Sequence, residues 1–160
     1  MILAATGHRP ERLGGYDDAT YLELRQFALG YIRQRQPAKV INGMALGWDT
    51  AWAAAAVYAG VPFIAAVPFL GQESRWPGPS QARYRALLAK AAEVVVVCQG
   101  DYSAQAMQRR NEWMVDRCDE VVALWDGSAG GTSNCVHYAR RIGRPVENLW
   151  VEWILIGSLA

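Results

Sequence analysis

A short apolar run that ends in a glycine-containing loop and leads into a helix occurs twice in this sequence. In the first copy, residues 40–41 lead through residues 43–50 into an alanine-rich segment at 51–59. In the second copy, residues 121–125 lead through a loop at 126–132 into residues 133–142. A helix that starts at glycines leaves backbone N–H groups and a positive dipole end open to an anion such as phosphate. The two copies therefore indicate a chain that binds a nucleotide-type ligand.

Strand-like and helix-like segments alternate along the chain. Strands are predicted at residues 2–5, 39–42, 61–69, 93–98, 120–125 and 145–147. Helices are predicted from a capping box at residues 20–23, at 51–59, at 80–91 with Ser80 as the cap, at 104–117 and at 132–142. Such alternation with short links implies parallel strands and right-handed crossovers. The predicted fold class is α/β, a single Rossmann-like doubly wound, mainly parallel sheet flanked by helices, in one domain over residues 1–160.

Two apolar segments carry further predictions. The four valines at residues 94–97 are typical of a strand that is covered on both faces. Residues 149–160 form an apolar C-terminal extension. Its segment 149–156 is interpreted either as an extra strand on its own sheet or as a surface buried against a second subunit. The sequence thus favours a homodimer or a higher homo-oligomer.

Composition limits the classes of function. The 160 residues are 52% hydrophobic and 19% charged, which indicates a compact globule with a sizeable core. The formal net charge of +1 disfavours general nucleic-acid binding, which usually requires a strong basic excess. The three cysteines form no CxxC pair and are expected to be reduced thiols. Residues 1–5 suit a strand better than a signal peptide, and no run approaches the ~20 apolar residues of a membrane span. A soluble, cytoplasmic protein with no membrane partner is predicted.

Polar, glycine and aromatic residues follow the predicted strands at their carboxyl ends. In an open parallel sheet, ligands collect at this rim. The candidate ligand-binding residues are Thr6, Gly7, His8, Arg9, Gly43, Met44, Ala45, Gly47, Asp49, Gln72, Glu73, Trp76, Arg110, Asn111, Asp126, Gly130, Gly131 and Thr132. We expect phosphates to rest on the backbones of residues 43–47 and 130–132, with His8, Arg9 and Arg110 neutralising their charge.

Several of these residues have a second interpretation. His8 and Arg9 either bind an anion or belong to a solvated loop. Asp49 is either the N-cap of the alanine-rich helix or an acceptor for a ribose hydroxyl, a role that Asn111 could share. Arg110 either meets the ligand or pairs with acidic neighbours on the surface of its own helix.

Other chemistry finds less support in the sequence. Trp76 either stacks on a base or covers the core. No spacing of His, Cys, Asp and Glu suggests a metal site. Neither a Walker GxxxxGK[ST] loop nor a GxGxxG motif is present, so NAD-dependent hydride transfer is not supported. No cofactor is expected beyond a nucleotide-derived ligand.

Five ordered motifs resemble a known family. They are TGHRP at residues 6–10, GMALGWD at 43–49, PFLGQE at 68–73, RNEWMVD at 110–116 and ALWDGSAGGT at 123–132. Together they resemble the YspA-like branch of the SLOG superfamily, whose relatives include the DprA/Smf and LOG proteins. The resemblance extends from about residue 1 to about residue 145. It implies a Rossmann-like fold that binds nucleotides or nucleotide-derived ligands, in a bacterial or phage protein.

The resemblance also bears on catalysis. In LOG phosphoribohydrolases a catalytic glutamate follows a Gly-Thr pair, whereas Gly131 and Thr132 here lead to Cys135. The favoured function is therefore non-catalytic binding or sensing of a nucleotide, either ADP-ribose-like or a signalling nucleotide. One alternative is a hydrolase or transferase at the same site, with Glu73 as acid/base. The other is DprA-like binding of single-stranded DNA, which the near-neutral charge disfavours.

Overall fold

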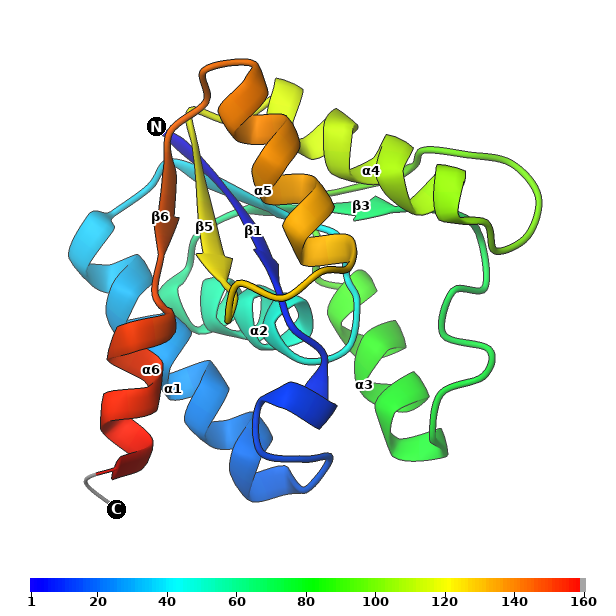
Figure 1. The fold of residues 1–160 in the computed structure, drawn as a ribbon. Helices are drawn as coiled ribbons and strands as arrows, with labels where there is room; N and C mark the ends of the chain where they lie inside the picture. The colour runs from blue at the N-terminus through cyan, green and yellow to red at the C-terminus, as the bar shows by residue number, and fades with distance from the viewer. Residues whose placement is uncertain (159–160) are drawn as a thin grey trace.

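The computed structural model describes residues 1–158 of the chain (Figure 1). The strands are β1 (Ile2–Gly7), β2 (Lys39–Asn42), β3 (Phe63–Val67), β4 (Glu93–Val96), β5 (Glu120–Leu124) and β6 (Val146–Asn148). The helices are α1 (Asp18–Arg35), α2 (Trp48–Ala59), α3 (Gly78–Leu88), α4 (Ala104–Asp116), α5 (Gly131–Arg141) and α6 (Trp150–Ser158), with a short 3-10 turn at Pro10–Arg12. All strand pairs are parallel, in the order β4-β3-β2-β1-β5-β6. The predicted α/β Rossmann-like fold is confirmed.

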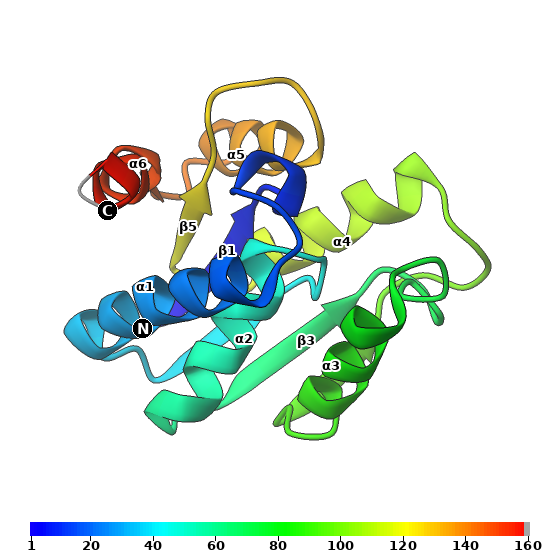
Figure 2. The same cartoon turned by 90° about the horizontal axis from the view of Figure 1, so that it is seen from below.

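Helices cover both faces of this sheet (Figure 2). α1, α2 and α3 lie on one face, and α4 and α5 lie on the opposite face. Because successive side chains of a strand point to opposite faces, Leu3 and Ala5 of β1 join the core beneath α1 and α2, whereas Ala4 joins the core beneath α4 and α5. In α2, residues 48–56 are all buried, including both Trp48 and Trp52. The alanine-rich sequence lets this helix approach the sheet and its neighbours closely.

The direction of winding changes between β1 and β5. From β1 the chain winds through β2 and β3 to the edge strand β4, and α4 then returns it to β5 on the other side of β1. α5 continues outward to β6. In a doubly wound sheet, the crevice at such a point lies at the carboxyl ends of the two strands. The loops that follow Gly7 and Leu124 therefore open into one crevice.

Two helices begin earlier than predicted. The cap of α1 is Asp17, whose Oδ1 accepts a hydrogen bond from the backbone N–H of Thr20 at 2.7 Å. Thr20 therefore lies inside the helix and does not cap it. The third helix begins at Gly78, directly after Pro77, so Ser80 is not its cap. In each case an aspartate or proline upstream starts the helix before the predicted cap.

The expectation that the valine-rich strand is covered on both faces is wrong. β4 is the edge strand of the sheet and pairs with β3 alone. Val95 and Val97 pack against the core cluster that includes α4, but Val94 and Val96 are 45% and 40% exposed on the other face. An apolar run predicts a strand, but it does not tell whether that strand lies at the centre or at the edge of the sheet.

The apolar C-terminal segment forms a helix, so the predicted extra strand is wrong. α6 lies beside α1, and its Trp150 and Trp153 pack against the main core (Figure 1). Its outer side exposes Val151 and Ile154, whereas Ile156 lies at the groove between α6 and α1. Residues 159–160 of the predicted extension lie outside the described residues. Within residues 1–158, no helix is both long and apolar enough to cross a membrane.

Candidate ligand-binding site

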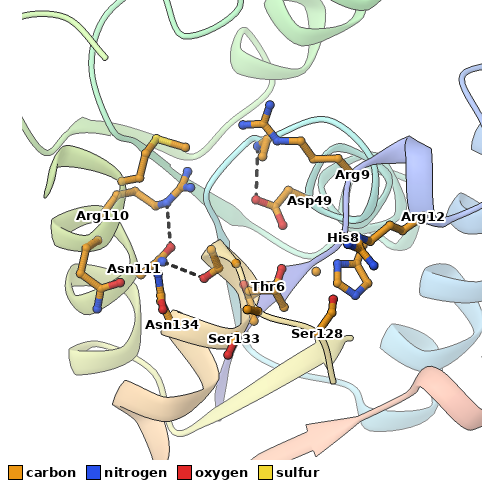
Figure 3. Close-up of a pocket in the computed structure, with 18 of the residues that line it drawn as sticks. Thr6, His8, Arg9, Arg12, Asp49, Arg110, Asn111, Ser128, Ser133 and Asn134 are labelled. Atoms are coloured by element: carbon orange, nitrogen blue, oxygen red, sulfur yellow. Dashed lines mark hydrogen bonds between the residues drawn. The ribbon is translucent and has the colours of Figure 1, made fainter. Parts of the chain in front are cut away.

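A cavity of about 530 Å³ opens at the carboxyl ends of β1 and β5 (Figure 3). It is formed by the loop after β1, the start of α2, the first half of α4 with the segment before it, and the loop from β5 into α5. The lining residues are Thr6, Gly7, His8, Arg9, Glu11, Arg12, Ala45, Asp49, Tyr102, Ala104, Met107, Gln108, Arg110, Asn111, Ser128, Ala129, Gly130, Gly131, Thr132, Ser133 and Asn134. Its volume lies within the range of roughly 300–1,000 Å³ that is usual for small-molecule sites.

The structure divides the predicted ligand-binding residues into two groups. Those that line the cavity are Thr6, Gly7, His8, Arg9, Ala45, Asp49, Arg110, Asn111, Gly130, Gly131 and Thr132. Those that do not line it are Gly43, Met44, Gly47, Gln72, Glu73, Trp76 and Asp126. Most residues in the second group belong to the loops after β2 and β3. Their side chains and carbonyls support the cavity wall or the neighbouring core.

Sequence reasoning missed part of the wall. Tyr102, Ala104, Met107 and Gln108 come from the start of α4 and the turn before it. Ser128, Ala129, Ser133 and Asn134 flank the predicted glycines on the last loop, and Glu11 and Arg12 follow the predicted cations. Helical spacing could have identified Ala104, Met107 and Gln108, since residues 104, 107, 108 and 111 share one face of α4. If residue 111 lies at the rim of the sheet, the residues on the same face of the preceding helical turns lie at the rim as well.

The amino end of α5 is open to the cavity. Its N-cap is Gly130, which has a φ of +146° and no side chain to cap the helix. The residues of its first turn, including Gly131, Thr132 and Ser133, all line the cavity. The first N–H groups of a helix have no partner within the helix, and here no side-chain oxygen replaces one. This end is therefore suited to an anion.

The amino end of α2 differs, because the protein itself occupies it. The N–H of Met44 donates to Oδ1 of Asn42 at 2.9 Å, and that of Ala45 donates to Oδ2 of Asp49 at 3.2 Å. The N–H of Trp48 donates to the carbonyl oxygen of His8 at 3.2 Å. The expected phosphate cradle at residues 43–47 thus has these donors already engaged. The sequence predicts two similar loops, but the structure leaves the second one open.

Gly47 and Gly43 are required by close approaches in this region. Gly47 has a φ of +89°, and a Cβ there would lie 2.5 Å from the carbonyl oxygen of His8. A Cβ at Gly43 would lie 2.2 Å from Nη1 of Arg110. Both glycines therefore shape the wall of the cavity without facing it.

Arg110 is buried, so the predicted alternative of a surface ion pair is wrong. Its Nη1 donates to the carbonyl oxygen of Gly43, and its Nε donates to Oδ1 of Asn111 at 3.2 Å. Nδ2 of Asn111 in turn donates to the carbonyl oxygen of Gly131 at 3.3 Å (Figure 3). Burial lowers the pKa of Arg110. These two neighbours on α4 tie the loop after β2 to the start of α5.

Asp49 is not the N-cap of α2, because that position belongs to Gly47. It lies in the first turn of the helix and is only 5% exposed. While Oδ2 accepts the hydrogen bond from Ala45, the buried Oδ1 has no partner among the described residues. Burial raises the pKa of Asp49 to about 6. The positive charges of Arg110 and Arg9 oppose this rise. The cavity wall therefore carries a buried carboxylate that lies near two cations and has one oxygen, Oδ1, without a hydrogen bond in residues 1–158.

His8 joins the loops after β1 and β5. Its Nε2 accepts a hydrogen bond from the backbone N–H of Asp126 at 2.9 Å and lies 2.9 Å from Oδ1 of the same residue. Arg12 also contacts Asp126, at 3.0 Å. The hydroxyl and N–H of Ser128, together with His8, hold the pKa of Asp126 well below its usual range. In contrast, Arg9 is exposed, and the structure records no hydrogen bond or ion pair for its guanidinium within residues 1–158.

Neither the predicted acid/base Glu73 nor the residue at the position of the LOG glutamate lines the cavity. Cys135, at the position of the LOG glutamate, is fully buried behind Thr6, and burial raises the pKa of its thiol to about 12. Glu73 is buried but does not line the cavity.

Trp76 packs against Tyr84, with ring centroids 5.2 Å apart, so it covers the core and does not face the cavity. Within the described part of the chain, no group of three or more His, Cys, Asp or Glu side chains could hold a metal ion.

Gln72 has a supporting position. Its Nε2 lies 3.2 Å from both the carbonyl oxygen of Gly43 and the hydroxyl of Tyr84. Gly43 therefore accepts hydrogen bonds from Gln72 and from Arg110. These contacts hold the loop after β2 from two sides.

Sequence comparison relates the chain to known proteins. A model of the YspA SLOG family matches residues 3–143. The uncharacterized SPbeta prophage-derived protein YoqJ of Bacillus subtilis is 32% identical over 142 residues, which cover 76% of this chain and 83% of YoqJ. The match confirms the resemblance that the five motifs indicated.

Structural comparison finds the same fold in larger proteins. DNA processing protein A (DprA) of Streptococcus pneumoniae superposes with a TM-score of 0.63 at 18% identity, over 91% of this chain and 49% of DprA. DprA of Helicobacter pylori, which is described as having a unique single-stranded DNA binding mode, gives 0.66 at 17% identity, over 92% and 64%. The molybdenum cofactor binding protein of Rippkaea orientalis gives 0.58 at 16% identity, over 92% and 74%. The chain thus spans about half to two thirds of the DprA proteins, and these likenesses concern the fold alone.

Proposed function

Because the chain belongs to the YspA SLOG family, we propose that it binds or senses a nucleotide or nucleotide-derived small molecule in the cavity between β1 and β5. The ligand is either ADP-ribose-like or a signalling nucleotide. The observation that carries this proposal is the uncapped amino end of α5, whose first turn lines the cavity. Such a helix end attracts phosphate through free N–H groups and a positive dipole end.

Charge around the cavity supports the same conclusion. Arg9 and Arg12 line it from the loop after β1, and Arg110 lines it from α4. Arg12 and Arg110 already have hydrogen-bonded protein partners, whereas Arg9 makes no hydrogen bond or close ion pair within residues 1–158 and interacts through its charge with Asp49 and Glu11. Arg9 is therefore the cation best placed to meet a phosphate. A charge-assisted hydrogen bond of this kind contributes roughly 1.5–3 kcal/mol.

Binding has more support than catalysis. The acid expected for a LOG-type hydrolase is replaced by Cys135, which is buried and protonated at neutral pH. Glu73, the alternative acid/base, lies outside the cavity wall. A hydrolase or transferase would release base or sugar phosphate from the nucleotide. Chromatography of AMP and ADP-ribose after long incubation with the protein tests this, and we expect both to stay intact.

The DprA-like alternative rests on fold similarity to proteins that include a single-stranded DNA binder. Against it stand the net charge of +1 and the buried carboxylate of Asp49 in the cavity wall, since both disfavour a polyanion. The molybdenum cofactor binding protein, which has the same fold, supports a small-molecule occupant. A small nucleotide is therefore the favoured ligand.

Thermal unfolding in the presence of AMP, ADP, ADP-ribose, NAD, cyclic AMP and a short thymidine oligonucleotide tests the proposal. A ligand at a hundred times its Kd adds about 2.7 kcal/mol to the free energy of unfolding, which raises the Tm visibly. Arg9→Ala should weaken binding of the active nucleotide roughly ten- to a hundred-fold. Arg109→Ala is the matched control, because Arg109 is exposed on α4 and does not line the cavity.

Each outcome of this panel has a clear meaning. A shift with one class of nucleotide that is lost in Arg9→Ala and kept in Arg109→Ala supports the site. A shift with the oligonucleotide alone, not competed by mononucleotides, would replace the proposal with DprA-like binding. No shift with any nucleotide would overturn it.

We also propose that the chain forms a homo-oligomer. The outer face of α6 exposes Val151 and Ile154, which are three residues apart on the helix and are 60% and 47% exposed. Neighbouring apolar side chains on an exposed helix are typical of an association surface. The proposed partner of this face is a second copy of the chain.

A further inference from the structure

We infer that the cavity selects ribonucleotides over deoxyribonucleotides, with Asp49 accepting a hydrogen bond from a sugar hydroxyl of the ligand. The inference rests on the proposed function, because it assumes that a nucleotide occupies the cavity. It makes Asp49 a specificity-determining residue. It also separates a small ribonucleotide from DNA as the occupant of this site.

The first argument is the unmatched oxygen of Asp49. The residue is 5% exposed and lines the cavity, and its Oδ1 is a buried atom with no hydrogen-bond partner within residues 1–158. A buried polar atom without a partner is costly, and nearly all such atoms in proteins are matched by protein, water or ligand. An ionised carboxylate can only accept hydrogen bonds. A hydroxyl group of the ligand would supply the donor that this oxygen lacks.

The second argument is that the other predicted acceptor is already engaged. Asn111 could also have held ribose hydroxyls, but its Oδ1 accepts from Arg110 and its Nδ2 donates to Gly131. Both ends of its amide are thus engaged in joining α4 to the neighbouring loops. Of these two residues, only Asp49 has an oxygen without a hydrogen bond within residues 1–158, so Asp49 is the better acceptor for a ligand hydroxyl.

The third argument is the division of charge within the cavity. A carboxylate repels phosphate, and the N–H groups of Ala45 and Trp48 beside Asp49 are already bonded to protein oxygens. The open N–H groups of α5 lie across β1 from this point, because β1 pairs with β2 on one side and β5 on the other. Phosphate is therefore expected at α5, and an uncharged donor at Asp49.

The fourth argument is the distance between these two positions. Asp49 follows β2 and the open helix end follows β5, and two strand spacings amount to about 10 Å. Because the Asp49 side chain points into the cavity, its carboxylate lies closer than this to the open end of α5 (Figure 3). In a nucleotide the sugar hydroxyls are the donors closest to the phosphate, and donors on the base lie farther away. A ribose hydroxyl therefore suits Asp49 better than a base amine.

Isothermal titration with AMP and ADP, and with their 2′-deoxy and 3′-deoxy forms, tests the inference on the wild-type chain. We expect at least one deoxy form to bind roughly ten- to a hundred-fold more weakly than its ribonucleotide, as for loss of a hydrogen bond to a charged group. Equal affinities for the ribo and both deoxy forms would overturn the inference and leave the proposed function intact. If none of these nucleotides binds and no compound of the thermal unfolding panel raises the Tm, both the inference and the proposed function are overturned.

The variant Asp49→Asn identifies the residue responsible. Its Oδ1 can still accept the hydrogen bond from Ala45, so the loop is preserved, but the cavity then faces an NH₂ group in place of an acceptor. We expect weaker AMP binding and a ribo-to-deoxy ratio that falls to within about threefold. Glu73→Gln is the matched control, an acid-to-amide change at a buried carboxylate outside the cavity, and it should keep the wild-type ratio. An unchanged ratio in Asp49→Asn would exclude Asp49 from this role.

Discussion

The buried guanidinium of Arg110 donates a hydrogen bond to the carbonyl oxygen of Gly43, 67 residues earlier in the chain. Since Asn111 bonds Gly131, adjacent residues of α4 hold both glycine-containing loops. The distance between the two loops is therefore fixed by α4, which forms one wall of the cavity. Any change in the Arg110 contact should alter the stability of the fold and the shape of the site together.

Gly43→Ala is expected to destabilise the protein. The new Cβ would lie 2.2 Å from Nη1 of Arg110, and the guanidinium cannot move away without losing its buried partner. We expect a loss of about 1–3 kcal/mol in the free energy of unfolding, measured by urea denaturation. Gly30→Ala is the matched control, since Gly30 lies within α1 with open space at its Cβ position and should gain about 0.5–1 kcal/mol. Equal stability of Gly43→Ala and wild type would contradict the close approach.

Asp49 should make the stability of the ligand-free protein depend on pH. Its pKa is raised from 3.8 to about 6 by burial. Well below pH 3.8 the carboxyl is protonated in both the folded and the unfolded state, so its burial does not lower the free energy of unfolding. As the pH rises to about 6, the unfolded chain ionises while the folded chain resists, which removes up to about 3 kcal/mol of stability.

Comparison with Asp49→Asn isolates this effect from other titrating groups. The free energy of unfolding of the variant, relative to wild type, should increase by up to about 3 kcal/mol between pH 4 and pH 7. Urea denaturation of both proteins at the two pH values measures the difference. If the two pH profiles run parallel, Asp49 does not have a raised pKa.

Reaction of the native protein with Ellman's reagent should label Cys98 before the other cysteines. Cys98 is partly exposed, whereas Cys118 and Cys135 are buried, and burial raises their pKa values to about 11 and about 12. Because the thiolate is the reactive form, both should react only on unfolding. Cys98→Ser should remove the fast phase. Rapid labelling of Cys135 in the native protein would contradict its burial.

Light scattering tests whether α6 joins two copies of the chain. Truncation before Leu149 would also remove Trp150 and Trp153 from the core, so a surface change is more informative. Ile154→Glu places a charge on the exposed face and should shift the wild-type oligomer to monomer without loss of Tm. Gln105→Glu, at an exposed position on α4 on the opposite face of the sheet, is the charge control. A monomeric wild-type protein at all concentrations would contradict the prediction.

Local sequence signals predicted the order of elements well. The strand at residues 39–42 was located at its observed bounds, and the alanine-rich helix was predicted to end at Gly60, where the structure places its cap. The alternation of strands and helices with short links implied parallel pairing, which all five strand pairs show. The predictions failed where an apolar run had no distinguishing period: the valines of β4 lie at an edge, and the C-terminal run is a helix.

The sequence by itself determined that the residues after β1, β2 and β5 meet at one rim, because alternating strands and helices with short links permit few other arrangements. Only the tertiary structure decided what each residue does there. The two glycine-containing loops look alike in sequence, yet the N–H of Trp48 at the start of α2 is bonded to His8, whereas the end of α5 is open. Likewise Arg110 turns inward to Gly43, and Asp49 keeps one oxygen unpartnered. These outcomes depend on contacts between residues far apart in the chain, which no local pattern encodes.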